Sequence, residues 1–113
     1  MILVVHRSAP LRRLLVASLA ELDRSVVAAS TAEQALELIK RHEGHFSLLV
    51  TGNILPGMDG PELALRFRQC CGPVVPVIMT SAYERPPDGA CDVFIREPFE
   101  VADVVRAARR LTG

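Results

Sequence analysis

Short apolar runs alternate with amphipathic helical patterns along this 113-residue chain, and this alternation constrains the fold more than any other feature. Five runs have the character of strands: residues 2–5, 25–29, 46–51, 74–80 and 92–95. They are apolar without an inside–outside alternation, which is typical of strands that are buried on both faces. Strands separated by helices imply right-handed crossovers, and therefore one parallel sheet with helices on both sides.

The first two helices are predicted from their start signals. Ser8 and Pro10 precede leucines that recur at helical spacing, which predicts a helix from about this point. Ser30 to Glu33 has the pattern of a capping box, in which a hydroxyl and a carboxylate three residues later satisfy free backbone N–H groups. We therefore expect the second helix to be capped at Ser30.

The third and last helices are predicted from a cap and from apolar spacing. Asp59 is expected to cap the third helix, since a carboxylate there can accept a hydrogen bond from the first turn. Leu63, Phe67 and Cys70 are expected to form its inner face. The last helix is predicted from apolar residues on one helical face, at Val101, Val104, Val105, Ala108 and Leu111.

The segment between the fourth and fifth runs does not suit a regular helix. Residues 81–92 contain Pro86, Pro87 and Gly89, which oppose helix formation, so we expect a loop or a single turn there. The predicted fold is α/β, with a doubly wound five-stranded parallel sheet in the order 2-1-3-4-5 and a shortened or missing fourth helix. One domain should span residues 1–113.

Charge and hydropathy exclude several function classes. The 13 basic and 13 acidic residues give a formal net charge of zero, which argues against a direct nucleic-acid partner or an anionic membrane surface. Half of the residues are hydrophobic, so the chain can bury a core. The apolar run at the N-terminus is too short for a signal peptide or a membrane span, and we expect a soluble, cytoplasmic protein.

The cysteines and two of the histidines do not form a metal-binding pattern. Cys70, Cys71 and Cys91 are odd in number and lack the spacing of a metal knuckle, so we interpret them as reduced thiols rather than as a redox switch. His42 and His45 could form a metal pair, but no third ligand is apparent. A solvated helix end explains both histidines better.

Polar residues gather where the predicted strands end. In a sheet of this order, binding and chemistry occur beyond the carboxyl ends of the strands, where the strand order reverses. His6 and Arg7 follow the first strand, and Gly52 follows the third. Ser81 follows the fourth strand and Glu97 the fifth, so these five residues are expected to share one edge of the sheet.

Four stretches resemble the receiver domain of response regulators in two-component signalling. These are "ILVV" at the first strand, "LPGMDG" after the third, "PVIMTSAY" at the fourth and "FIREPFE" at the last. The resemblance covers nearly the whole chain and implies a flavodoxin-like fold. It also implies a family chemistry, which is phosphoryl transfer from a histidine kinase to an aspartate. That transfer needs a carboxylate nucleophile, two acidic residues that hold Mg²⁺, a hydroxyl and a lysine.

The residues that carry this chemistry in the family are replaced here, with one exception. Matched to the family's motifs, Gly52 stands at the acceptor aspartate, and His6 and Arg7 stand at the acidic pair. Glu97 stands at the lysine, and only the hydroxyl remains, as Ser81. The resemblance therefore implies a degenerate phosphoacceptor pocket with no catalytic residue, no bound cofactor and no Mg²⁺ site.

The charges of this pocket are inverted relative to the family, and two interpretations are open. In the first, Arg7 and Glu97 form a permanent ion pair that fixes one conformation of the switch, whose aromatic position is Phe94. In the second, catalysis was lost, the residues drifted, and both side chains lie in solvent. An exposed pair would then contribute less than ~1 kcal/mol.

We expect a non-catalytic receiver-like domain of two-component or phosphorelay signalling that acts through protein–protein interaction and is not an enzyme. The partner could be a kinase, an output domain or a second copy in a homodimer. A different class of function is a sensor of small anionic ligands, which His6, Arg7 and Ser81 could bind. The third hypothesis is a conventional phosphoacceptor response regulator.

Overall fold

The computed structural model describes residues 1–113 and contains the predicted five-stranded parallel sheet. The strands pair in the order β2-β1-β3-β4-β5, which confirms the predicted order. Their bounds are β1 (Ile2–Val5), β2 (Val26–Ala29), β3 (Leu48–Gly52), β4 (Val77–Ser81) and β5 (Val93–Arg96). The fourth strand starts later than its apolar run because Val74 is 91% exposed and Pro76 has no N–H to donate to a ladder.

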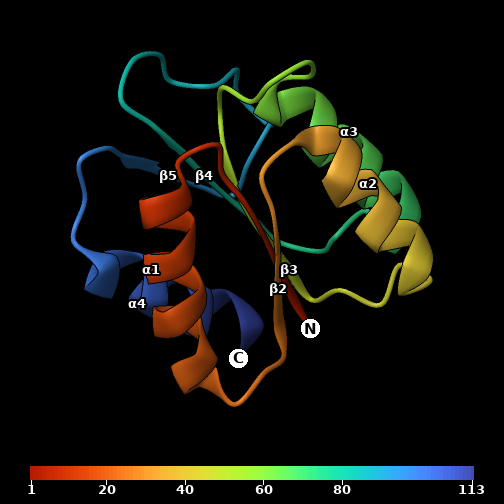
Figure 1. Ribbon diagram of the computed structural model, residues 1–113, viewed down its shortest axis with the longest axis horizontal. Coiled ribbons are helices and arrows are strands. Elements are labelled where there is room, and N and C mark those ends of the chain that lie inside the picture. The colour runs from red at the N-terminus through yellow and green to blue at the C-terminus, as the bar shows by residue number, and fades with distance from the viewer.

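Four α-helices cover the sheet in two layers. Figure 1 shows α1 and α4 on one side of the sheet and α2 and α3 on the other. The bounds are α1 (Ala9–Leu19), α2 (Ala32–Arg41), α3 (Gly60–Cys71) and α4 (Val101–Thr112), and a short 3₁₀ turn, η1 (Ala20–Leu22), follows α1. None of these helices is both long enough and apolar enough to cross a membrane.

The hydrophobic core is split by the sheet into two clusters. Successive residues of a strand point to opposite faces, so each apolar run supplies both clusters. The cluster under α2 and α3 is built around Leu3, Val5, Leu49, Phe67 and Met79. The cluster under α1 and α4 is built around Ile2, Val4, Val50, Ile78 and Val104. Burial on both faces explains why the runs show no polar alternation.

Two of the predicted helix starts are confirmed and one is displaced by a residue. Ser8 and Asp59 cap α1 and α3. The cap of α2 is Thr31, not Ser30: its hydroxyl accepts from the backbone N–H of Gln34 at 3.1 Å, and Gln34 reaches back to the N–H of Ser30 at 3.0 Å. The Ser/Thr-x-x-Glu/Gln pattern occurs in two overlapping frames here, and the helix uses the later one.

The predicted inner face of α3 is correct for two of its three residues. Leu63 and Phe67 are fully buried, but Cys70 is exposed, and Cys71 packs against the α2/α3 cluster instead. With 3.6 residues per turn, positions four and eight after Leu63 are Phe67 and Cys71, which stay on one stripe. Cys70 lies one position to the side of that stripe.

The segment between β4 and β5 forms no helix, as predicted. Hydrogen bonds of Asp92 connect the end of this segment to α3 and β4. Asp92 Oδ2 accepts from the backbone N–H of Val77 at 2.7 Å and from Arg68 Nη2 at 2.8 Å. A second Arg68 nitrogen, Nη1, donates to the carbonyl of Gly89 at 3.1 Å. The carboxylate of Asp92 therefore joins α3, the start of β4 and the end of the loop.

Substituting Asp92→Ala should destabilise the protein, because it leaves the Val77 N–H and the Arg68 guanidinium without their acceptor. We expect a loss of about 1–2 kcal/mol, since Asp92 is partly exposed and water replaces some of the interaction. Urea unfolding followed by circular dichroism measures the change. The matched control is Asp88→Ala in the same loop, which removes no hydrogen bond; equal losses for the two variants would contradict this role.

Candidate functional site

Four side-chain positions from four strands meet in a row at the carboxyl edge of the sheet. His6 and Glu97 directly follow β1 and β5, Gly52 is the last residue of β3, and Thr80 is the last but one of β4. The residues two positions before them are Val4, Val50, Ile78 and Ile95, and these four pack in the cluster under α1 and α4. Because the strand period is two, all four positions lie on this same side.

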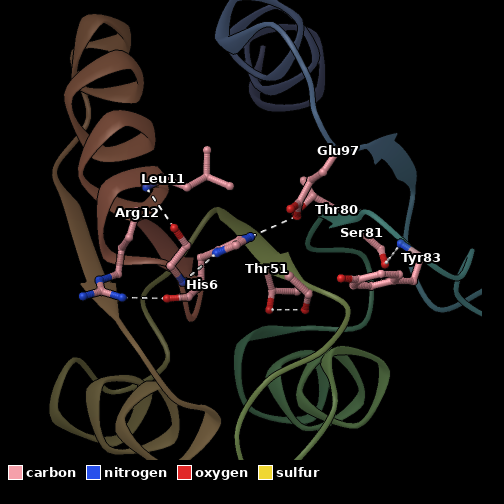
Figure 2. Close-up of polar contacts among 10 residues, drawn as sticks. His6, Leu11, Arg12, Thr51, Thr80, Ser81, Tyr83 and Glu97 are labelled. Atoms are coloured by element: carbon pink, nitrogen blue, oxygen red, sulfur yellow. Dashed lines mark hydrogen bonds and ion pairs between the residues drawn. The ribbon is translucent and has the colours of Figure 1, made fainter.

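His6 and Glu97 are in direct contact across this row. His6 is only 6% exposed, and its Nε2 lies 3.0 Å from Glu97 Oε2. Thr80 Oγ1 donates to the same carboxylate oxygen at 2.7 Å. Figure 2 shows the imidazole extending from the end of β1 toward the carboxylate. Two donors therefore converge on one oxygen of Glu97, which compensates its partial removal from water.

The backbone fixes the tautomer of His6. The N–H of Ser8 donates to His6 Nδ1 at 3.0 Å, so Nδ1 must carry a lone pair. The ring proton is then on Nε2, which donates to the carboxylate of Glu97. The contact is a hydrogen bond between a neutral imidazole and an ionised carboxylate rather than an ion pair. Arg12 Nη1 also donates to the carbonyl of His6 at 2.7 Å, which anchors the residue on its other side.

The hypothesised ion pair between Arg7 and Glu97 is not formed. Arg7 is exposed and has no carboxylate within 4.0 Å. Arg7 lies two residues beyond the end of β1, at the rim of the cavity, and makes no hydrogen bond or ion pair with Glu97. The alternative, in which both side chains lie in solvent, is wrong for Glu97, because Glu97 is hydrogen-bonded to His6 and Thr80.

The cavity at this edge is nearly filled. It has a volume of about 30 Å³, room for only a couple of water molecules. A Cβ added at Gly52 would lie 3.4 Å from His6 Cδ2, in ordinary van der Waals contact with the ring. The acceptor position of the family motif thus faces the imidazole. Ser81 lines the cavity, but its Oγ accepts from the N–H of Tyr83 at 3.2 Å and contacts neither His6 nor Glu97.

The residues of this edge do not fit a divalent cation. Mg²⁺ requires near-octahedral coordination by oxygens, usually with one or more free carboxylates. Glu97 is the only carboxylate that lines the cavity, and its Oε2 already accepts two hydrogen bonds. Arg7 adds a permanent cation at the rim. Nowhere do three or more His, Cys, Asp or Glu side chains gather as a metal site would require, and this includes His42 and His45.

Thr80, which bonds to Glu97, and Arg12, which bonds to the carbonyl of His6, were both missed by the sequence analysis. The family resemblance directed attention to the next residue, Ser81, as the hydroxyl position. The signal that could have found Thr80 is its register with Gly52, because cross-strand neighbours share a face of the sheet.

Phe94, at the aromatic switch position, lies close to two arginines. The ring is half-buried, with Arg85 Cζ at 5.3 Å and Arg96 Cζ at 5.5 Å from its centroid. Both distances are within the range of cation–π attraction. A switching role for Phe94 stays a prediction.

The cysteines take no part in this site. All three are free thiols. Burial raises the pKa of Cys71 to about 11, and burial also raises the pKa of Cys91. Both thiols are therefore protonated at neutral pH, and a protonated thiol is a poor nucleophile.

A match to a protein-family model shows the family of the chain. The model of the response regulator receiver domain matches residues 2–92. The chain belongs to the response regulator receiver family. The parallel sheet in the order 2-1-3-4-5 and the placement of the site at its carboxyl edge agree with this assignment. Receiver domains are signalling modules of two-component systems, where they interact with proteins such as kinases and output domains.

Solved receiver domains share the whole fold. The signal receiver domain of an HD domain-containing protein from Pseudomonas fluorescens Pf-5 is 26% identical, with a TM-score of 0.81 over 98% of this chain and 85% of that one. The receiver domain of NtrX from Brucella abortus is 25% identical, with a TM-score of 0.82 over 99% and 98% of the two chains. The chemotaxis protein CheY4 of Vibrio cholerae, at 19% identity and a TM-score of 0.85 over 97% and 96%, shows the fold alone. No curated protein matches this receiver domain.

We expect His6 to be the neutral Nε2–H tautomer in solution, because the Ser8 N–H occupies Nδ1. Two-dimensional ¹H–¹⁵N NMR of the histidine rings at neutral pH measures this, with a pyridine-like shift at Nδ1 and a pyrrole-like shift at Nε2. His45 is an internal control, since it is exposed and makes no ring hydrogen bond. Two pyrrole-like shifts for His6 would mean an imidazolium and would contradict the assignment.

A carboxylate at residue 52 should be destabilising here because it would face that of Glu97. We expect Gly52→Asp to be about 1–2 kcal/mol less stable than the isosteric Gly52→Asn, and the difference to vanish in a Glu97→Gln background. Thermal and urea unfolding of the four proteins give the values. If Asp and Asn prove equally stable with Glu97 intact, the cavity can hold two carboxylates and the repulsion argument is wrong.

Proposed function

We propose that this receiver domain signals by contact with a partner protein, without accepting a phosphoryl group. The observation that carries the proposal is the hydrogen bond between His6 Nε2 and Glu97 Oε2, made directly over Gly52. Glycine offers no nucleophile, and the neighbouring imidazole and carboxylate occupy the region where a phosphoryl group would need a metal and cations.

The proposal includes the loss of Mg²⁺ binding. Phosphoryl transfer in this family depends on a divalent ion that neutralises charge on the transferred oxygens. Glu97 is already bonded to two donors, and Arg7 would repel a cation from the rim of the cavity. Without a nucleophile or a metal, the domain has no catalytic role of its own and is not an enzyme.

The network also explains how one conformation can persist without phosphate. His6 is bonded to Ser8 at the start of α1, and Glu97 is bonded to Thr80 at the end of β4. The β1–α1 connection, the end of β4 and the β5–α4 connection are thus tied together by the protein alone. The state of the domain is then governed by what binds its surface, and a kinase, an output domain or a second copy are the candidate partners.

No feature favours the alternative of a small-anion sensor. The cavity of about 30 Å³ leaves too little space for an organic anion, and Glu97 lies within it. An incoming carboxylate or phosphate would meet a like charge that His6 and Thr80 hold in place.

We predict that the protein remains unmodified when it is incubated with acetyl phosphate and Mg²⁺, because no carboxylate stands at residue 52. Intact-mass spectrometry detects a phosphoryl adduct directly. An adduct on the unaltered chain that requires Mg²⁺ would overturn the proposed function.

The control is a variant of the same chain with the family's charges restored. It carries His6→Asp, Arg7→Asp, Gly52→Asp and Glu97→Lys and keeps Ser81. Once circular dichroism shows that it is folded, we expect a Mg²⁺-dependent adduct in this variant only. The same variant without Gly52→Asp should stay unmodified, which identifies the acceptor.

A further inference from the structure

The outer edge of β5 is open. β5 is the last strand of the sheet and pairs only with β4. The N–H of Glu97 donates toward β4, to the carbonyl of Ser81 at 2.9 Å. Because the main-chain groups of a strand alternate in direction, those of Phe94 and Arg96 point to the outer edge. No loop and no side chain makes a hydrogen bond to the main chain of Phe94 or Arg96.

β5 is less buried than the interior strands, as is the other edge strand, β2. Every residue of β1, β3 and β4 is buried, whereas three residues of β5 are half-buried and Arg96 is exposed. Figure 1 shows β5 at the margin of the sheet, beside the long connection that replaces a helix. Main-chain donors and acceptors at such an edge can pair with another extended segment.

Two unneutralised arginines flank this edge. Arg85 and Arg96 both stack near the ring of Phe94, and both are exposed. Neither has a carboxylate within 4.0 Å. Arg85 makes no hydrogen bond, and Arg96 uses only Nη1, which donates to the carbonyl of Tyr83 at 3.1 Å. Stacking on an aromatic ring orients a guanidinium while its N–H edge stays free for a planar anion such as a carboxylate.

We propose that the open edge of β5 binds an extended, acidic segment of a partner protein, which adds to the sheet as a sixth strand. Main-chain hydrogen bonds to Phe94 and Arg96 supply the pairing, and carboxylates of the segment bind the guanidinium groups of Arg85 and Arg96. The inference rests on the proposed function in one respect, since it names the chemistry of the protein partner through which the domain signals.

Other occupants fit this edge less well. A second copy of the chain paired through β5 would bring four guanidinium groups together with no carboxylate bound to them, which is repulsive. A nucleic acid has no main-chain donors and acceptors of the kind that pair with a strand edge, and the chain has no net positive charge to attract it. An acidic protein segment satisfies both the edge and the arginines.

The test is a titration of ¹⁵N-labelled protein with a capped peptide of about eight residues that alternates Glu and Val, long enough to form a strand. We expect shift changes centred on the amides of Phe94 and Arg96 and slower hydrogen exchange at both. The combined Arg85→Ala and Arg96→Ala variant should bind about tenfold more weakly or worse. Arg110→Ala, an exposed arginine of α4, should bind as the unaltered protein does.

Two further peptides separate the main-chain and charge contributions. The same peptide N-methylated at every residue keeps its charge but loses its main-chain donors, and a Lys–Val peptide keeps the donors but reverses the charge. Both should bind at least about tenfold more weakly. Three results with peptides would overturn the proposal: either further peptide binding as tightly as the Glu–Val peptide, shift changes centred away from β5, or no binding of the Glu–Val peptide. The proposal would also fail if a single-stranded oligonucleotide shifted these amides and the Glu–Val peptide did not.

The variants are compared only where their ¹H–¹⁵N spectra remain dispersed, so that loss of binding is distinguished from loss of fold. The titration uses no phosphoryl donor and no metal. Its failure therefore leaves the phosphorylation result untouched, and a phosphoryl adduct in that other assay would not alter the affinity for the peptide.

Discussion

The hydrogen bond between His6 and Glu97 is the interaction on which the carboxyl edge of this sheet depends. It spans from the end of β1 to the end of β5, over the end of β3, and Thr80 adds a second donor from β4. A half-buried carboxylate is costly unless donors replace the lost water, and here the protein supplies both donors. The backbone of Ser8 ensures that the imidazole donates rather than accepts, because it occupies the other ring nitrogen. Local chain geometry therefore determines the electrostatics of the site.

The carboxylate of this edge is compensated differently from those of a receiver that accepts a phosphoryl group. There a metal ion neutralises the anionic residues, and the metal can bind or leave with the signal. Here Glu97 accepts hydrogen bonds from two neutral side chains of the same chain, His6 and Thr80. A ligand shifts a conformational equilibrium only through different affinities for its two states. Under the proposed function, the cavity is filled by its own side chains and such a difference arises on the outer surface, where a partner protein contacts the domain.

The sequence was sufficient for the fold but only partly for the site. The apolar runs predicted five parallel strands, because strands buried on both faces are apolar throughout. The two prolines of the β4–β5 connection predicted the missing helix, because proline has no backbone N–H to donate. The five pocket positions were also predicted to lie together, and all five line one cavity. The partner of Glu97 was not predicted. Whether Arg7 or His6 lies in the row depends on the register in which β1, β3, β4 and β5 pair, and that is a property of contacts between distant segments.

In the proposed binding mode, the edge of β5 disfavours association with a second copy and accepts an acidic partner. An uncovered strand is a hazard because any other edge can pair with it, and proteins commonly protect such edges with charged residues and proline. Arg96 lies on this edge, Arg85 lies beside it, and Pro98 follows the strand, where it cannot donate to a ladder. These residues disfavour pairing with a second copy, since like charges would meet. The same guanidinium groups, held against Phe94, attract carboxylates. In the proposed binding mode, the residues that protect against self-association therefore also select the charge of the partner.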